Sequence, residues 1–525
     1  MVKTRESWGS RIGLVLAAAG GAVGLGNFLR FPGVAAQNGG GAFMIPYFIA
    51  FLFLALPLSW LEWTMGRYGG RHGHGCAPGI FDAMGLRRYP ALKYLGVFGI
   101  TGAVGIFFYY LYVESWTLAY SVFALTGKYS GIASPNEMGE FLGSYLSGSG
   151  KYFHGHGPAY VCFLITFVCN FLIVYHGVNK GIERFCKFAM PSLFIMAILL
   201  IVRVFTLDAP IKPEWNINQA LGYLWNPDFS VLKSGKVWLE AAGQVFFSTS
   251  VGIGALLTYA TYIKSKDDAL LSATSAAFLN EFAEVVLGAS IVVPAAYIFF
   301  GPEGTSSAVS GGTFGLAFKT TPLIFNHMPG GAIAGFAWFF LLFISGITSA
   351  VSIMQPGIAF LEDEFRISRK HSIAALGIVA FLVSQAVIFG DCVVDELDFW
   401  FSSFGLPLFG CIEVLVFITV WGGDRGWAEI NRNADIHLPK FARLIVYYFT
   451  PVFLLAILLG WLATDGWKTI ILKKSVDGQL VDLYTPQQLP WVIGTRIFYF
   501  GFIALVCWLV NCAWKRNYRS NIKRY

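Results

Sequence analysis

The chain has 525 residues, of which 56% are hydrophobic and only 13% are charged, with a net charge of +7 and a mean hydropathy of +0.61. Soluble domains carry about a quarter charged residues, so this composition excludes a single water-exposed globular domain and indicates a polytopic membrane protein. The positive charge is spread over short loops, which argues against a nucleic-acid-binding surface and fits loop charges that orient membrane helices.

The first apolar run extends from about residue 12 to residue 36, which is long enough to cross a bilayer. Its middle holds four glycines, at positions 20, 21, 24 and 26, followed by Asn27, Arg30 and Pro32. Glycines in series allow a helix to unwind, and unwound backbone at membrane depth is tolerated only where protein or a wet cavity satisfies its N–H and C=O groups. This run is therefore predicted to be a broken helix that lines a polar site.

About twelve apolar runs follow one another along the chain, and each predicts a membrane-spanning helix. They begin near residues 12, 41, 95, 159, 187, 237, 270, 332, 373, 399, 444 and 492. Alternate loops are rich in Lys and Arg, as are the amino terminus and the tail over residues 515–524. The positive-inside rule therefore predicts that both termini are cytoplasmic.

The first and sixth runs share a short pattern, because residues 23–26 and 251–254 both read Val-Gly-x-Gly within an interrupted apolar segment. Two spans broken at corresponding places predict an inverted-repeat transporter whose site lies between the halves. The halves would cover about residues 10–206 and 236–421, with helices eleven and twelve over about residues 443–515. Chance and close packing of small residues also produce such pairs, so both explanations stay open at this point.

Neutral oxygen ligands gather in the interrupted runs and in the eighth run. They are the freed carbonyls of the first run and the side chains of Asn27, Ser248, Thr249, Ser250, Ser345, Thr348 and Ser349. Such groups could replace the hydration shell of Na⁺, whereas a cage of carboxylates would suit a divalent cation better. Each hydroxyl alone is better explained by a hydrogen bond to the carbonyl one turn earlier, so the predicted ion site depends on their concentration here.

The helix that restarts after Gly24 predicts an anion site. The N–H groups of Leu25 and Gly26 would be unpaired there, and the positive end of the helix dipole would attract a carboxylate such as that of an amino acid. The phenol of Tyr110 could donate to the same carboxylate, although a tyrosine of the membrane interface is an equal alternative.

Several carboxyl groups fall inside the apolar runs, namely those of Glu62, Glu114, Glu240, Glu281, Glu284 and Glu413. Isolated charge inside a membrane is costly, so such groups are functional candidates, with a protonated structural carboxyl as the alternative. Asn280 and Glu284 lie four residues apart and can point into one cavity. His72 and His74 lie in a loop without a third ligand, which predicts solvated side chains rather than a metal site.

Ten segments, taken in order, resemble the neurotransmitter:sodium symporter family, and in particular its bacterial branch. They read AVGLGNFLRFP, NGGGAFMIPY, EWTMGRYGG, YYLYVESW, GQVFF, LNEFAEVVLG, TSAVSIMQP, FLEDE, SRKH and DELDFW. The resemblance implies an all-α fold of twelve transmembrane helices with the LeuT-type inverted repeat of five plus five helices, in which helices one and six are broken. Residues 1–525 would form a single transmembrane transporter domain.

The same resemblance implies a symporter that imports a neutral, hydrophobic L-amino acid with Na⁺ by alternating access across a bacterial inner membrane. Na⁺ would occupy two sites. We expect no organic cofactor, no enzyme activity and no nucleic-acid partner, and we expect contact with membrane lipid and pairing into a homodimer. The alternatives are an ion channel, which would need an uninterrupted polar lining or a ring of charge, and another membrane-embedded solute-binding protein.

Site residues follow from the resemblance by position. The substrate would be bound by Ala22, Leu25, Gly26, Ile106, Tyr110, Phe247, Ser248, Ser250, Ile253, Ser349 and Ile353. The first sodium site would use Ala22, Asn27, Ser248 and Asn280, and the second would use Gly20, Val23, Ser345, Thr348 and Ser349. Arg30 and Asp398 would form the external gate, and the internal gate would consist of Arg5, Asp363, Tyr262 and Trp8.

Glu284 stands where chloride-dependent relatives have a small hydroxyl residue that helps to bind the anion. A fixed carboxylate would supply that charge, so we expect chloride-independent transport with proton counter-movement as Glu284 titrates, and Glu62 could share the proton. Departures from the family's leucine transporter are Gly21 for Asn, Ser248 for Thr, Ile253 for Phe and Ile106 for Val. These changes can alter the order of affinity among hydrophobic substrates, but the sequence does not say which substrate is preferred.

Overall fold

The computed structural model describes residues 6–86, 88–476 and 479–522 of the chain. Within these residues, ten helical stretches are long and apolar enough to cross a membrane, and a bent pair of helices makes an eleventh. The stretches are Gly40–Arg71, Leu92–Thr126, Gly157–Tyr175, Val178–Phe205, Ala269–Ser310, Gly331–Glu364, Arg369–Phe389, Val393–Trp421, Lys440–Thr464 and Leu489–Arg516, and the bent pair is Arg11–Ala22 with Gly26–Gln37. The predicted all-α membrane bundle is confirmed, whereas the predicted number of twelve spans is not.

Most of the bundle consists of helices that are joined in many places by π-helical turns. The helices are α1 (Arg11–Ala22), α2 (Phe31–Gln37), α3 (Met44–Ala50), α4 (Leu56–Arg71), α7 (Val97–Thr126), α9 (Gly157–Tyr175), α10 (Arg184–Phe205), α12 (Gly235–Ser248), α13 (Ala255–Ala260), α14 (Ala269–Glu281), α15 (Val292–Ser310), α18 (Gly331–Ala359), α19 (Arg369–Phe389), α20 (Val393–Leu397), α21 (Gly405–Val416), α24 (Thr450–Trp461) and α26 (Leu489–Ile522). The π-helical turns are η1 (Gly26–Arg30), η3 (Phe51–Ala55), η4 (Val178–Glu183), η6 (Phe282–Gly288), η7 (Leu316–Thr320), η8 (Phe360–Glu364), η9 (Asp398–Phe404), η10 (Phe417–Trp421), η11 (Ile445–Phe449) and η12 (Leu462–Gly466).

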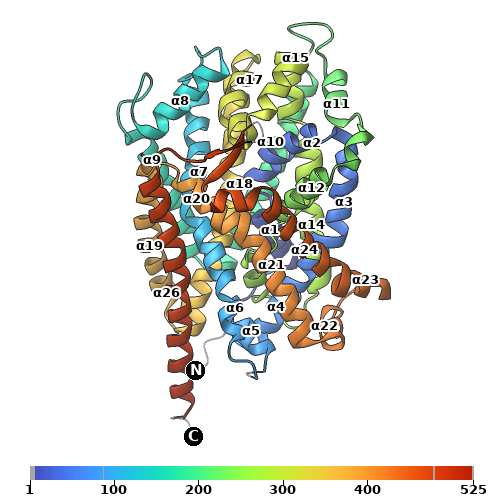
Figure 1. Ribbon diagram of the computed structural model, residues 1–525, viewed down its shortest axis with the longest axis vertical. Coiled ribbons are helices and arrows are strands. Elements are labelled where there is room, and N and C mark those ends of the chain that lie inside the picture. Colours follow the sequence, from blue (N-terminus) through green and yellow to red (C-terminus); the bar gives the residue numbers. More distant parts are fainter. Residues whose placement is uncertain (1–5, 87, 477–478, 523–525) are drawn as a thin grey trace.

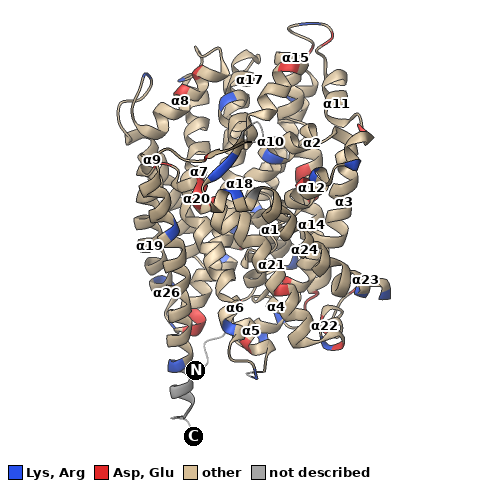
Figure 2. Cartoon of the chain, in the orientation of Figure 1, with Lys and Arg blue, Asp and Glu red and all other residues tan. Residues whose placement is uncertain are grey.

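Shorter elements lie at the ends of the bundle. They are α5 (Ala77–Met84), α6 (Leu92–Leu95), α8 (Pro135–Ser147), α11 (Ile217–Trp225), α16 (Gly312–Gly315), α17 (Thr321–His327), α22 (Gly423–Ile430), α23 (Lys440–Leu444), α25 (Trp467–Ile470), the 3-10 turns η2 (Gly40–Phe43) and η5 (Phe229–Lys233), and the strands β1 (Lys473–Val476) and β2 (Gln479–Asp482). We call the end that holds α5 and α22 the terminal end, because α26 finishes there, and the end that holds α8, α11 and α17 the opposite end (Figure 1). Charged residues are sparse along the middle of the bundle and more frequent toward its ends (Figure 2).

The first span is broken where its glycines predict. Ser10 caps α1 by accepting a hydrogen bond from the N–H of Gly13, as serine does at helix N-termini. The helix ends at Ala22, because Val23 takes an extended conformation with ψ of 94°. The chain resumes as η1 and α2, and the two halves meet at a bend of 52°.

The sixth span is interrupted by six residues between α12 and α13. Within them Ser250, Gly252 and Gly254 have φ of 55°, 74° and 85°, the left-handed region that ends a helix. A side chain at Gly252 would lie 2.7 Å from the carbonyl oxygen of Leu406, so only glycine fits there. The predicted break is confirmed, and it explains the count of spans, because halves of 14 and 6 residues are each too short to cross a bilayer alone.

Two details differ from the sequence expectation. Helix five begins at Val178 rather than near residue 187, since η4 and the first turn of α10 include the charged residues that were predicted to form a loop. The loop before the last helix forms an antiparallel hairpin, in which Lys473 pairs with Asp482. Charged first turns and exposed strands lack a sustained apolar pattern, so hydropathy alone does not find them.

Candidate functional site

A large cavity reaches from the two helix breaks toward the opposite end, where Lys236 of α12 and Thr464 of η12 line it, and its volume is about 1120 Å³. All eleven residues predicted to bind the substrate line this cavity, namely Ala22, Leu25, Gly26, Ile106, Tyr110, Phe247, Ser248, Ser250, Ile253, Ser349 and Ile353. The fold therefore gathers groups from four separate helical regions around one space. A concave, largely apolar lining with a few convergent polar groups is typical of a small-molecule site.

Gly24 lies at the centre of the first break. Its N–H donates to Oδ1 of Asn27 at 2.8 Å, so this side chain holds the unwound segment in place. A Cβ added at Gly24 would lie 3.1 Å from Oγ of Ser349 and 3.6 Å from the hydroxyl of Tyr110. Hydroxyl groups from α18 and α7 therefore approach the exposed main chain directly.

The carbonyl groups freed by the first break face α18. Oγ of Ser345 donates to the carbonyl of Val23 at 2.9 Å, and Oγ of Ser349 donates to that of Gly20 at 3.4 Å. Thr348 lies against the same turn, because a Cβ added at Gly20 would lie 3.1 Å from Cβ of Thr348. The structure thus brings together all five residues predicted for the second sodium site, and their carbonyl and hydroxyl oxygens fit a hard monovalent cation.

Glu284 on η6 is the centre of a buried polar cluster beside the first break. Its carboxylate accepts from Nδ2 of Asn27 at 3.0 Å and from Nε2 of Gln244 at 2.6 Å. Nδ2 of Asn27 also donates to Oδ1 of Asn280 at 2.9 Å, so two residues predicted for the first sodium site lie side by side. The other two, Ala22 and Ser248, line the adjoining cavity.

Glu62 makes its hydrogen bond with helix six rather than with this cluster. Its Oε1 accepts from the backbone N–H of Gly252 at 2.5 Å. The carboxyl beside Glu284 is instead that of Glu281, which accepts from the hydroxyl of Tyr47 at 2.6 Å. Glu62 therefore supports the break of helix six, and Glu281 is a second buried carboxyl group that interacts with Glu284.

The two residues predicted for the external gate stand apart. The guanidinium of Arg30 lies over the ring of Phe247, 5.5 Å from its centroid, while Asp398 accepts from the hydroxyl of Tyr109 at 2.7 Å. No ion pair between Arg30 and Asp398 occurs among the described residues, and Phe247 is 40% exposed. The cavity is therefore open toward the opposite end.

The terminal end is closed by Trp8, which is only 4% exposed. Its indole N–H donates to the carbonyl of Tyr259 at 2.9 Å, and its backbone N–H donates to that of Tyr262 at 3.3 Å. The hydroxyl of Tyr262 in turn accepts from Nε2 of Gln355 at 2.7 Å. Of the other predicted internal gate residues, Asp363 lies in η8, and Arg5 falls outside the described residues.

Two polar residues outside the cavity lining support the site and were not singled out by the sequence analysis. Gln244 donates to Glu284, and a buried amide just before a broken segment is the signal that points to it. Glu183 accepts from the N–H of Gly9 at 2.6 Å and from Oγ of Ser10 at 2.9 Å, and so fixes the start of α1. Its pairing with Lys187 four residues later, at 2.7 Å, is the helical pattern that could have identified it.

A bundle of membrane helices with two broken spans around one cavity, accessible from one end and closed at the other, defines a secondary transporter. A model of the Sodium:neurotransmitter symporter family matches residues 5–134 and 137–466. The chain therefore belongs to this family of sodium-coupled transporters, which are not enzymes.

Relatives extend over most of the chain. It is 31% identical to an uncharacterized sodium-dependent transporter of Methanocaldococcus jannaschii over 464 residues, which are 86% of this chain and 89% of the relative. It is 26% identical to the sodium-dependent serotonin transporter of Drosophila melanogaster over 490 residues, which are 87% of this chain and 76% of the relative. The crystal structure of MhsT in complex with L-phenylalanine matches with a TM-score of 0.72 and 30% identity over 87% of this chain and 99% of MhsT, which confirms the LeuT-type fold.

Proposed function

We propose that this transporter imports a neutral, hydrophobic L-amino acid together with Na⁺. The observation that carries the proposal is the composition of the cavity at the two breaks, where none of the eleven predicted substrate residues has a charged side chain. Main-chain N–H and C=O groups can bind a zwitterion, whereas a buried net charge would require a charged partner. That MhsT, which has the same fold, forms a complex with L-phenylalanine supports this class of substrate.

The substrate carboxylate would meet the N–H groups of Leu25 and Gly26 and the hydroxyl of Tyr110. Its ammonium would meet the carbonyls of Ala22, Phe247 and Ser248 and the hydroxyl of Ser250, which donates to the carbonyl of Gly21 at 3.2 Å. Three isoleucines, Ile106, Ile253 and Ile353, would surround the side chain, and each is less than 10% exposed. An aliphatic or aromatic side chain fits such a surface better than a polar one.

Two Na⁺ ions would be carried with each substrate. The first would lie between Asn27, Asn280, Ser248 and the carbonyl of Ala22, with the substrate carboxylate as its last ligand. Sharing a ligand couples ion and substrate, since each then raises the affinity for the other. The second would lie between the carbonyls of α1 and the hydroxyls of α18, where it would hold the first break against the eighth span.

We infer that transport does not require chloride, because the carboxylate of Glu284 occupies the cluster that a bound anion would otherwise complete. The terminal end would be cytoplasmic and the protein would lie in a bacterial inner membrane, in line with the basic loops at that end. The described conformation would then be open to the outside, and release of the substrate would require Trp8 to leave its place beneath the site. The five-plus-five repeat and a homodimer are further expectations from the family.

Uptake into proteoliposomes tests the proposal. A panel of labelled amino acids would be offered with an inward Na⁺ gradient and, in parallel, with K⁺ replacing Na⁺. We expect saturable, sodium-dependent uptake of large neutral amino acids such as Phe and Leu, and none of Lys or Glu. Counterflow of unlabelled substrate distinguishes a carrier from a channel. Uptake that is as fast in K⁺ as in Na⁺, or a preference for a charged amino acid, would refute the proposed function.

A further inference from the structure

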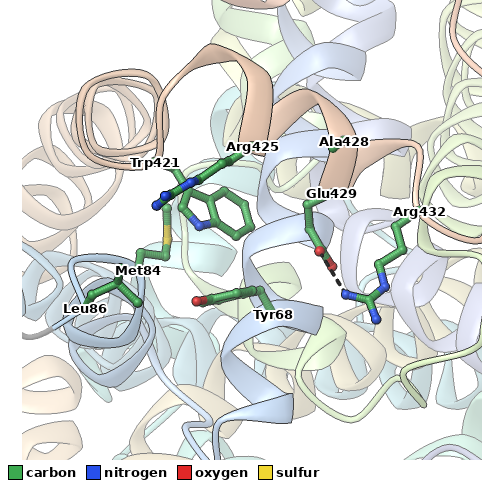
Figure 3. Close-up of a pocket in the computed structure, with 8 residues that line it drawn as sticks. All are labelled: Tyr68, Met84, Leu86, Trp421, Arg425, Ala428, Glu429 and Arg432. Carbon is green, nitrogen blue, oxygen red and sulfur yellow. Dashed lines mark hydrogen bonds and ion pairs between the residues drawn. The ribbon is translucent and has the colours of Figure 1, made fainter.

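A second pocket lies at the terminal end, away from the substrate cavity and sharing no residue with it. Its volume is about 370 Å³, and it is formed where α4, α5, η10 and α22 meet (Figure 3). The residues that line it are Tyr68, Met84, Leu86, Trp421, Arg425, Ala428, Glu429 and Arg432. Because α4 and η10 end their membrane spans here, the pocket lies at the depth of lipid headgroups.

Aromatic and apolar side chains make one wall. The rings of Tyr68 and Trp421 meet edge to face, with centroids 4.7 Å apart. Met84 is buried beside them, whereas Leu86 is 66% exposed and has a left-handed backbone with φ of 49°. Tyrosine and tryptophan are enriched at membrane–water interfaces, so this wall suits the boundary between lipid headgroups and acyl chains.

The other wall carries unbalanced positive charge. The single carboxylate of Glu429 is shared by three arginines, since Arg67 lies 3.3 Å and Arg432 3.4 Å from its oxygens and Arg71 is also in contact. No ion pair or hydrogen bond of Arg425 is present in the part of the chain that the structure describes. Figure 3 shows the guanidinium of Arg425 alongside Trp421 and that of Arg432 beyond Glu429. The lining itself holds two guanidinium groups and one carboxylate, and Arg67 and Arg71 behind it share that carboxylate, so the pocket favours an anionic ligand.

Exposed apolar side chains also lie on the span that is hydrogen-bonded to α22. Tyr447 of η11 donates to the carbonyl of Gly423 at 2.8 Å, which joins that span to α22. On the same segment Phe441, Leu444 and Tyr448 are 64%, 62% and 69% exposed. This surface faces lipid in a membrane bundle, so the molecule offers a cationic pocket at headgroup depth with an apolar track beside it.

We propose that this pocket binds the phosphate group of an anionic phospholipid. Arg425, whose guanidinium lies beside Trp421, contacts the phosphate with two donors in the geometry that guanidinium offers to phosphate oxygens, and Arg432, paired with Glu429, adds positive charge to the pocket. The glycerol backbone rests on Trp421 and Leu86, and the acyl chains lie along α23 and η11. The site is independent of the transported substrate, because it shares no lining residue with the substrate cavity.

Native mass spectrometry of the purified transporter tests the proposal. Phosphatidylglycerol and phosphatidylcholine with identical acyl chains would be titrated in detergent, and bound lipids counted. We expect the first binding step to be at least tenfold tighter for phosphatidylglycerol. The double substitution Arg425→Ala and Arg432→Ala should remove this difference. Lys515→Ala with Arg516→Ala, which deletes the same charge from exposed residues of α26 at the same end, should leave it unchanged.

Equal binding of the two lipids, or an equal loss in the α26 control, would overturn the proposal. Inorganic phosphate tests the alternative that the pocket binds a soluble phosphate rather than the phosphate group of a lipid. If millimolar phosphate displaces the lipid as effectively as phosphatidylglycerol itself does, the pocket is a site for a soluble anion and the proposal is wrong. A photoreactive residue at Leu86 gives a second readout, since it should cross-link phosphatidylglycerol in membranes, whereas the same group at Ile333, 72% exposed on α18, should not show this preference.

Discussion

Glu62 on α4 accepts a hydrogen bond of 2.5 Å from the backbone N–H of Gly252, 190 residues later in the chain. The side chain of Glu62 is fully buried, and Gly252 lies in the middle of the sixth span's break. The break leaves this N–H without a helical partner at a depth where no bulk water can replace it. Helix two thus stabilises the non-helical shape of helix six through one carboxyl group.

Gly252→Ala tests how strictly this shape is required. The left-handed φ of 74° costs a residue with a side chain roughly 1–2 kcal/mol, and the new Cβ would lie 2.7 Å from the carbonyl oxygen of Leu406. We expect the free energy of unfolding to fall by about 2 kcal/mol or more. Thermal unfolding of the purified protein measures the change. Gly102→Ala on α7 is the control, since nothing lies within 4 Å of its added Cβ; equal melting temperatures for the two variants would contradict the prediction.

Thr348→Val should weaken the second sodium site. The substitution keeps the shape of the side chain but removes a hydroxyl that donates at 2.9 Å to the carbonyl of Ser345, another residue predicted for this site. Loss of one ion ligand should raise the Na⁺ concentration for half-maximal substrate binding about tenfold, or about 1.4 kcal/mol. Binding of a labelled amino acid as a function of Na⁺ gives this value. Ser352→Ala should change it little, because it removes a similar hydroxyl of the same helix but Ser352 is not one of the predicted ion ligands.

Glu284→Ser should make uptake depend on chloride. Asn27 and Gln244 both donate to Glu284, and the substitution leaves these two amides without their anionic acceptor. A chloride ion can take that place, whereas the parent protein, as proposed above, would not need one. Uptake should be compared in chloride and in gluconate. Glu281→Gln, which changes a neighbouring carboxyl bound to Tyr47, should remain insensitive to chloride. If uptake by Glu284→Ser is also insensitive to chloride, the carboxylate of Glu284 does not replace a bound chloride ion.

The breaks of the first and sixth spans could be predicted because they depend on local backbone chemistry. The glycines at positions 20 to 26 mark the end of α1 at Ala22, and Gly252 and Gly254 supply left-handed backbone that other residues adopt only with strain. The start of helix five could not be predicted from hydropathy, since Lys180 and Arg184 lie within its first turns. A polar first turn resembles a loop when only the residue types are considered.

Pairings between distant helices were harder to predict than the residues that line the cavity. Spacing within one helix places Asn280 and Glu284 on one face, but it does not say which carboxyl from another helix meets them. The expectation that Glu62 could share the proton of Glu284 did not anticipate that Glu62 accepts a hydrogen bond from the backbone of Gly252. The distance between Arg30 and Asp398 depends on which conformation is populated, and a sequence specifies both conformations at once.

The pair of His74 and Glu364 should make stability depend on pH. Nδ1 of His74 lies 2.7 Å from Oε1 of Glu364, in the loop after α4. Burial alone lowers the pKa of His74, but the hydrogen bond to Glu364 and the nearby carboxylates of Asp82 and Asp363 together raise this pKa above its usual value. A raised pKa in the folded state means that the pair stabilises the fold fully below about pH 6.5 and that this contribution is lost as the pH rises.

We therefore expect His74→Gln to lower the melting temperature at pH 6 and to have a smaller effect at pH 8.5. His72→Gln is the control, because His72 lies two residues earlier on an exposed part of the same loop. A loss of stability that is the same at both pH values would show that His74 acts through packing rather than through its charge.

Trp8→Ala should open the terminal end. Trp8 is buried and donates to the carbonyl of Tyr259, so its side chain closes the path beneath the site. Replacing a buried tryptophan by alanine destabilises the packed state by about 3–5 kcal/mol. If only about 1.4 kcal/mol of this destabilises the closed state relative to the open state, the population of the open state rises tenfold. Cys186, which is fully buried beside Tyr259, can report the opening in a background where the other seven cysteines are serine.

A membrane-impermeant maleimide should label Cys186 about tenfold faster in Trp8→Ala than in the parent. Na⁺ should slow the reaction in both, because an ion at the proposed second site would hold α1 against α18 in the closed arrangement. Trp514→Ala serves as the matched control, since Trp514 lies on α26 and donates to Asp82 rather than to the gate. If both tryptophan variants label at the parent's rate, Trp8 is not what closes this end. If both label faster to the same degree, the effect is general loosening of the fold and not the opening of a gate.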